Sequence, residues 1–223
     1  SLQWRLDFIL TYLERDIPQL GLRIPATTLR RFWTMLAHVQ GGMMNMAQLA
    51  RNLGVDGKTV AHYLDVLVDL MLVRRLQPYA HNVGKRLVKS PKIYVRDSGV
   101  CHALLGIENR DDLLGHPVVG ASWEGHVIEN LLDTAPFFTT AYFYRTAAGA
   151  EIDLLLDIPK HGLWALEIKR AAPSKPDKGF YIACAYVTPS RCFVVNSGND
   201  RYSLGGNIEA LGVRAMAEEL RKL

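Results

Sequence analysis

The sequence has few cysteines and no long apolar run. Its three cysteines, Cys101, Cys184 and Cys192, form no CxxC pair and no zinc-ligand spacing among the 223 residues. Three is an odd number, which argues against a disulfide framework and favours a reducing compartment. No apolar stretch is long enough to span a bilayer, and no signal peptide is recognisable. We therefore expect a cytoplasmic protein with no membrane partner.

The chain also carries little excess charge, with 26 basic and 22 acidic side chains giving a formal net charge of +4. Because 49% of the residues are apolar, the chain can bury a proper core, which argues against a disordered protein. The charge is unevenly spread, since residues 74–96 hold seven basic residues and no acidic one. Such a block suits contact with a polyanion, and a solvated basic hairpin is an equally weighted alternative. The seven are Arg74, Arg75, Lys85, Arg86, Lys89, Lys92 and Arg96.

Two helical patterns, at residues 45–53 and 58–72, are separated by a tight turn that begins at Gly54. Ala50 is small enough for two helices to cross, as in a helix-turn-helix. Two strand-like runs, residues 73–78 and 92–95, follow and are joined by a basic loop in the position of a wing. We therefore predict a winged-helix domain in this part of the chain.

In a DNA-binding winged helix, the second helix would direct Lys58, Thr59 and His62 into the major groove. The cations of the wing would contact phosphates. The second helix has few Arg, Asn or Gln side chains, so weakly specific binding to the DNA backbone is expected. A rigid protein–protein adaptor is the alternative. The predicted phosphate contacts are Arg74, Arg75, Lys85, Arg86 and Lys89.

The composition changes near Gly99, and the remaining residues alternate between helical and strand-like patterns. We expect a loop at residues 110–117 and a helix at residues 123–134 with Ser122 as its cap. A closing helix is expected at residues 208–221. The other predicted elements are a short helix at 100–105, strands at 141–146, 151–158, 163–170 and 191–196, and a helix at 178–186.

Charged residues stand two apart in two of these otherwise apolar strands. Glu151 and Asp153 share one face of the first strand, and Glu167 and Lys169 share one face of the second. Buried carboxylates cost free energy unless a cation or a metal neutralises them. Two carboxylates beside a lysine suit Mg²⁺ or Mn²⁺, which would activate a water for attack on a phosphodiester. The lysine would orient that water or stabilise charge on the phosphate.

The length of the loop between the two strands decides whether this site can form. A four-residue loop would pair Ile158 with Leu163 and would turn Asp153 and Glu167 to opposite faces of the sheet. A loop with an odd number of residues pairs Asp153 with Glu167. The site therefore requires an odd connection or a β-bulge in this hairpin.

The order of these residues resembles the PD-(D/E)xK nuclease superfamily, which includes restriction enzymes and archaeal Holliday-junction resolvases. Asp153 matches the acid on the second core strand of that family, and Glu167-Ile168-Lys169 matches its (D/E)xK motif. Glu124 matches a glutamate that many members carry on the preceding helix. The resemblance implies Asp153, Glu167 and Lys169 as catalytic residues, and Glu124, Asp153 and Glu167 as metal ligands. No glutamine–tyrosine motif follows Lys169, which leaves the subfamily open.

From about Tyr12 onward, the chain is similar to the C-terminal part of a prokaryotic AAA-type ATPase family, whose second half is a domain of unknown function. The most specific segment is Lys-Ser-Pro-Lys-Ile-Tyr at residues 89–94. The resemblance implies an N-terminal ATPase domain as a partner within the natural protein, which we expect to continue upstream of Ser1. No GxxxxGK[ST] motif occurs in the chain, so we expect no ATP site and no other cofactor-binding residue in it.

These patterns together predict an α/β (α+β) chain. Residues 1–24 form a helix from the ATPase junction, and residues 25–98 form the winged-helix domain. Residues 99–223 form a restriction-endonuclease-like mixed sheet flanked by helices. The expected function is that of the C-terminal part of an AAA-type ATPase that binds DNA and hydrolyses phosphodiester bonds with a divalent metal. The alternative is a catalytically inactive nuclease-like module that binds DNA or a protein partner for the ATPase.

Overall fold

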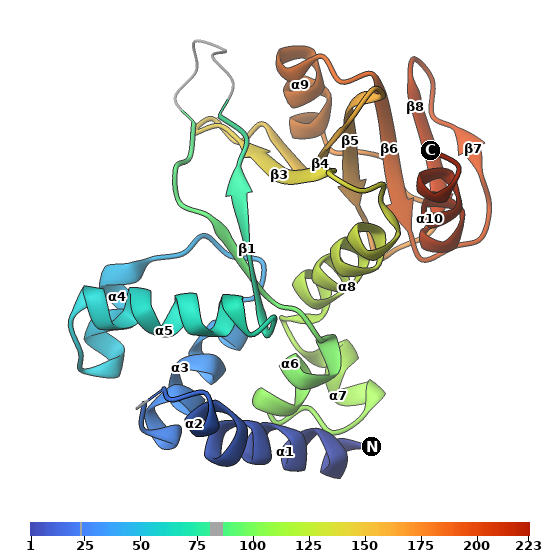
Figure 1. The fold of residues 1–223 in the computed structure, drawn as a ribbon. Helices are drawn as coiled ribbons and strands as arrows, with labels where there is room; N and C mark the ends of the chain where they lie inside the picture. Colours follow the sequence, from blue (N-terminus) through green and yellow to red (C-terminus); the bar gives the residue numbers. More distant parts are fainter. Residues whose placement is uncertain (23, 81–86) are drawn as a thin grey trace. The chain divides into compact units, whose positions relative to one another are not determined.

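The structure is a computed structural model in which the described residues form two compact units. The first unit comprises Ser1–Arg75 and Ile93–Gly125, and the second comprises Leu76–Lys92 and His126–Leu223. Figure 1 shows the helices and strands of each unit, which are described separately below. The described residues are 1–22, 24–80 and 87–223.

The first unit is built mainly of helices (Figure 1). It confirms the two predicted helices around Gly54, which adopts a left-handed conformation with φ of 73° and ends the first of them. The helices are α1 (Leu2–Thr11), the π-helical turn η1 (Tyr12–Asp16), α2 (Ile17–Gln19), α3 (Ala26–His38), α4 (Met46–Leu53), α5 (Gly57–Asp69), α6 (Ser98–Leu104) and α7 (Arg110–Gly115).

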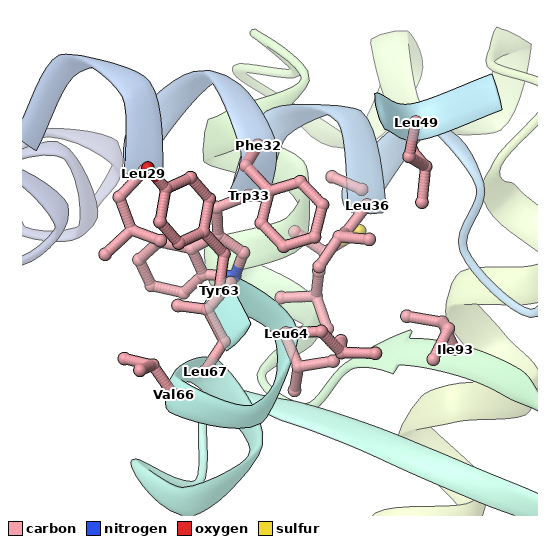
Figure 2. Packing of buried hydrophobic residues seen from close by; sticks show 14 of the residues in the cluster. Leu29, Phe32, Trp33, Leu36, Leu49, Tyr63, Leu64, Val66, Leu67 and Ile93 are labelled. Carbon is pink, nitrogen blue, oxygen red and sulfur yellow. The ribbon is translucent and has the colours of Figure 1, made fainter. Parts of the chain in front are cut away.

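The core of the first unit is organised around α3 and α5 (Figure 2). Phe32 and Trp33 of α3 are fully buried, and the ring of Phe32 lies 6.1 Å from that of Tyr63 on α5. Leu64 and Leu67 complete the apolar face of α5, one and four residues after Tyr63. This spacing places the three side chains on one side of the helix, so α5 keeps its opposite side for solvent.

Side-chain caps fix where several of these helices begin. Asn45 Oδ1 accepts a hydrogen bond of 3.0 Å from the backbone N–H of Gln48 and so caps α4. Asp56 caps α5 in the same way through the N–H of Thr59. These caps satisfy backbone donors that have no partner within the helix.

The second unit contains most of a mixed sheet of eight strands in the order β2-β1-β3-β4-β5-β6-β8-β7 (Figure 1). The neighbours β3, β4 and β5 are antiparallel, as are β7 and β8, whereas β1–β3, β5–β6 and β6–β8 are parallel pairs. The strands are β1 (Val73–Pro78), β2 (Lys92–Val95), β3 (Thr140–Arg145), β4 (Glu151–Ile158), β5 (Gly162–Ile168), β6 (Arg191–Asn196), β7 (Tyr202–Ser203) and β8 (Ile208–Gly212).

Helices α9 (Lys178–Val187) and α10 (Val213–Arg221) cover opposite faces of this sheet. Phe180 and Ala183 of α9 pack in one cluster with Val194 of β6. Arg191, three residues earlier on β6 and therefore on the other face, pairs with Glu219 of α10. A further helix, α8 (Val119–Thr134), spans the boundary between the two units.

Three local predictions were wrong. Residues 110–115 form helix α7 rather than a loop, because Asn109 caps the helix through the N–H of Asp112. Ser122 lies inside α8 rather than at its start, and its hydroxyl is 2.7 Å from His102 Nε2. Residues 208–212 form strand β8 because pairing with β6 overrides the helical preference of Glu209, Ala210 and Leu211.

The helices formed by the described residues include none that is both long and apolar enough to cross a membrane.

Replacing Asn45 by alanine should lower the free energy of unfolding by about 1 kcal/mol, because the backbone N–H of Gln48 loses its side-chain acceptor. Urea denaturation followed by circular dichroism measures this change. Asn52→Ala is the matched control, since Asn52 is exposed on the same helix. An equal loss of stability in both variants would contradict a capping role for Asn45.

Candidate active site

The hairpin of β4 and β5 has an odd connection. Pro159–His161 is a three-residue loop, because Ile158 pairs with Gly162, and the register runs on to Leu154 opposite Leu166. The next step along this register brings Asp153 opposite Glu167. A β-bulge lies at the same point, since the pairing of β3 with β4 shifts between Tyr142 and Tyr144. Bulges redirect a side chain locally, so this one helps to set the direction of Asp153.

Glu167 and Lys169 form a partly buried ion pair at the end of β5. Glu167 Oε1 lies 2.8 Å from Lys169 Nζ, and the glutamate is only 5% exposed. Burial raises the pKa of Glu167, although the hydrogen bond from Lys169 opposes this shift. Burial lowers the pKa of Lys169, but hydrogen bonds to Asp177 and Glu167 outweigh that effect and raise it overall. Lys169 therefore stays protonated at neutral pH, and its ammonium group favours the charged form of Glu167 against the effect of burial.

Asp177, the residue before α9, is the second partner of Lys169. Its Oδ2 lies 2.6 Å from Lys169 Nζ, and its side chain is 74% exposed. An ion pair with so exposed a group is weak, because water screens it. The contact with Glu167 is more protected, so Lys169 can release Asp177 while keeping Glu167.

Asp153 is held by groups from two other strands. One of its oxygens, Oδ2, accepts a hydrogen bond of 2.8 Å from the backbone N–H of Ile168 on β5. The other, Oδ1, lies 3.9 Å from Nζ of Lys92 on β2. The Asp153 carboxylate is thus fixed beside the residue that follows Glu167, and its side chain remains 17% exposed.

Lys92 is a site residue that the sequence pattern misplaced. The basic block suggested contact with a polyanion, but Lys92 is 3% exposed and lies 2.9 Å from Glu151 Oε1. Arg145 pairs with the other oxygen of Glu151 at 3.1 Å. A buried cation beside Glu151 and Asp153 offsets the cost of placing both acids in the sheet. In the sequence, the burial of Lys92 is indicated only by its position directly before the apolar run Ile93-Tyr94-Val95.

The ion pairs between the described residues of this cluster join four acids with three cations. No three His, Cys, Asp or Glu side chains among residues 1–22, 24–80 and 87–223 are grouped so that they could hold a metal ion together. A divalent ion would have to use two carboxylates and complete its shell with water or phosphate oxygens. The acids are Glu151, Asp153, Glu167 and Asp177, and the cations are Lys92, Arg145 and Lys169.

Glu124, the predicted third ligand, belongs to the first unit. There its Oε1 accepts a short hydrogen bond of 2.6 Å from the hydroxyl of Tyr94. The same helix carries Glu129 in the second unit, where that acid is buried. The sequence pattern singled out Glu124 alone, although Glu129 is the less exposed of the two.

The predicted DNA-binding residues fall into three groups. Lys58 and His62 are exposed on α5, and Lys89 is exposed as well. Thr59 donates its hydroxyl to the capping Asp56, and Arg75 is paired with Asp65, so both have an intramolecular role. Arg74 is half-buried, and Lys85 and Arg86 lie outside the described residues.

Comparisons with known proteins give a family description but no activity. Residues 1–111 match a family model described as Domain of unknown function (DUF8612), and residues 119–216 match another described as Domain of unknown function (DUF4143). The uncharacterized protein Rv2008c of Mycobacterium tuberculosis is 43% identical over 212 residues, and so is the uncharacterized protein Mb2031c of Mycobacterium bovis. The match covers 95% of this chain and 47% of each relative, so the chain spans about half of their length. No solved structure matches the chain.

Replacing Lys92 by methionine should destabilise the second unit by about 3 kcal/mol, because Glu151 and Asp153 lose their buried cation. Thermal and urea denaturation measure the loss. Lys175→Met, which removes an exposed lysine, is the control and should have little effect. Adding Glu151→Gln to Lys92→Met should restore part of the stability. If Lys92→Met alone is as stable as the control, the buried ion pair does not stabilise the fold.

Proposed function

We propose that the second unit is a divalent-cation-dependent nuclease module that cleaves phosphodiester bonds in DNA. The observation that carries this proposal is the register of β4 and β5. With its odd connection it brings Asp153 opposite Glu167, while Lys169 contacts Glu167 directly. This arrangement has the order that the PD-(D/E)xK resemblance implies. Asp153 is the acid of one strand, Glu167 is the acid of the next, and Lys169 is the lysine that follows it.

The chemistry of Asp153 and Glu167 supports a hydrated Mg²⁺ or Mn²⁺ ion as the cation that this site would bind. Asp153 and Glu167 offer hard oxygen ligands, and Mg²⁺ is usually bound by one or two carboxylates together with water and substrate phosphate. Burial raises the pKa of Glu167 against the opposing effect of Lys169, so a further cation beside this carboxylate would favour its charged form. A bound divalent ion would polarise the phosphodiester and lower the pKa of the attacking water.

Three side chains of this cluster would have the remaining roles. Asp153, fixed by the N–H of Ile168, has little freedom to turn away from the substrate side. Lys169 stays protonated and can exchange its exposed partner Asp177 for a phosphate oxygen, because both are anionic acceptors. Lys92 serves as a buried positioning residue whose charge partly offsets that of Asp153 at 3.9 Å.

We further propose that the first unit is a winged-helix module that binds the DNA backbone. The helices α4 and α5 with the Gly54 turn support this interpretation, and so do the exposed side chains of Lys58 and His62 on α5. The ion pair between Arg75 and Asp65 removes one predicted phosphate contact. In the natural protein, both units would act with an ATPase domain carried by the additional length seen in the relatives.

Cleavage of plasmid, branched and single-stranded DNA in the presence of Mg²⁺ or Mn²⁺ tests the nuclease proposal. Asp153→Asn should reduce the rate to background, and Lys169→Met should reduce it by at least about 100-fold, because a charge-stabilising donor is lost. Asp157→Asn is the matched control, since Asp157 is an exposed acid on the same strand. The proposal fails if the unaltered chain cuts none of these substrates with either ion.

DNA binding should weaken when Lys58 is replaced by alanine, and the slope of log affinity against log salt should decrease by about one for the lost phosphate contact. Fluorescence anisotropy with a labelled duplex at several salt concentrations measures both quantities. Arg110→Ala removes an exposed cation from α7 of the same unit and serves as the control. Affinity that is independent of salt would argue for a protein partner in place of DNA.

A further inference from the structure

Two free thiols lie close together in the second unit. Cys184 is on α9 and Cys192 is on β6, and their sulfur atoms are 3.6 Å apart. The two elements pack together through Phe180, Ala183 and Val194. A disulfide bond is about 2.05 Å long, so the sulfurs would have to approach by about 1.5 Å. Small rotations of both side chains can supply part of this movement without separating α9 from the sheet.

The two thiols differ in exposure and in acidity. Cys184 is half-buried, which gives a small oxidant a route to the pair, whereas Cys192 is 7% exposed. A hydrogen bond with Cys184 lowers the pKa of Cys192, although burial opposes this. The same hydrogen bond, together with burial, raises the pKa of Cys184. Cys192 is therefore the thiol that ionises first, and the thiolate is the reactive form.

We propose that Cys184 and Cys192 form a peroxide-responsive thiol pair that closes into an intramolecular disulfide between α9 and β6. The Cys192 thiolate attacks a hydroperoxide oxygen, the O–O bond breaks, and the leaving oxygen takes up a proton. Cys192 thereby becomes a sulfenic acid. The sulfur of Cys184 then attacks Cys192, the S–O bond breaks, and the departing hydroxide leaves as water with the proton from Cys184. The two thiols lose two electrons, and hydrogen peroxide is reduced to two waters.

The disulfide would restrain the helix that helps to hold the candidate active site. Asp177 precedes the first residue of α9 and pairs with Lys169, and the charge of Glu167 influences Cys184. Only seven residues separate Cys184 from Cys192, so the bond closes a short loop and constrains the unfolded chain less than a long-range disulfide would. The pairing of the two thiols does not depend on whether the site cleaves DNA.

Peptide mapping of the full 223-residue chain tests the proposal. The chain is treated with hydrogen peroxide, the remaining thiols are alkylated, and the protein is digested with trypsin. Cleavage after Arg191 separates the cysteines, so the disulfide appears as peptide 179–191 linked to peptide 192–201. Dithiothreitol should regenerate both thiols. The pair should be lost more than about ten times faster than Cys101, whose pKa burial raises to about 12.

Single variants separate the two chemical steps. Cys184→Ser should stop the reaction at the Cys192 sulfenic acid, which dimedone traps, and Cys101→Ser should leave disulfide formation unchanged. The proposal is overturned if Cys184 and Cys192 stay alkylatable while Cys101 is consumed, if all three thiols react at one rate, or if the disulfide joins two chains. Mapping of the unaltered chain decides these outcomes even if a serine variant does not fold.

Discussion

The candidate site depends on the partly buried ion pair between Glu167 and Lys169. Glu167 lies in a strand whose other side chains are apolar, and its charge would be costly there without a cation. Lys169 supplies that cation from the position directly after the end of the strand. An ion pair of this kind is weak as a source of stability, because well-packed apolar residues could often replace it without loss. Because such a pair adds little stability, binding of a charged ligand would better explain why these residues occur at the end of an otherwise apolar strand.

The need for a cation beside each buried carboxylate also shapes the neighbouring strands. Lys92 on β2 lies near both Glu151 and Asp153, so these two acids of β4 have a cation within reach. Arg145 from β3 shares Glu151. The acids of the hairpin thus lie on β4 and β5, whereas their cations come from β2, from β3 and from the residue that follows β5. Removing one cation changes the charge balance of the whole cluster, which is why the buried lysine matters more than its distance of 3.9 Å from Asp153 suggests.

Sequence reasoning predicted the strands of this hairpin well, because apolar runs with charges at period two leave few alternatives. It also stated the condition on the β4–β5 loop, and the three-residue connection at Pro159–His161 meets it. It could not predict that Lys92 is buried, since burial depends on which strands become neighbours in the sheet. The strand at 208–212 was predicted as helix for the same reason: its partner, β6, is distant in sequence from the residues that decide its local preference.

Helix α9 contacts both the candidate active site and the apolar core of the second unit. Asp177 at its start contacts Lys169, and Cys184 near its end contacts Cys192 on β6. The start of α9 is held by an exposed ion pair, which water weakens, whereas its apolar side is fixed by Phe180 and Ala183. Lys169 can therefore change partners without any movement of the helix body. A substrate phosphate would compete with Asp177 for Lys169 at a small cost, while Glu167 would remain paired in the interior.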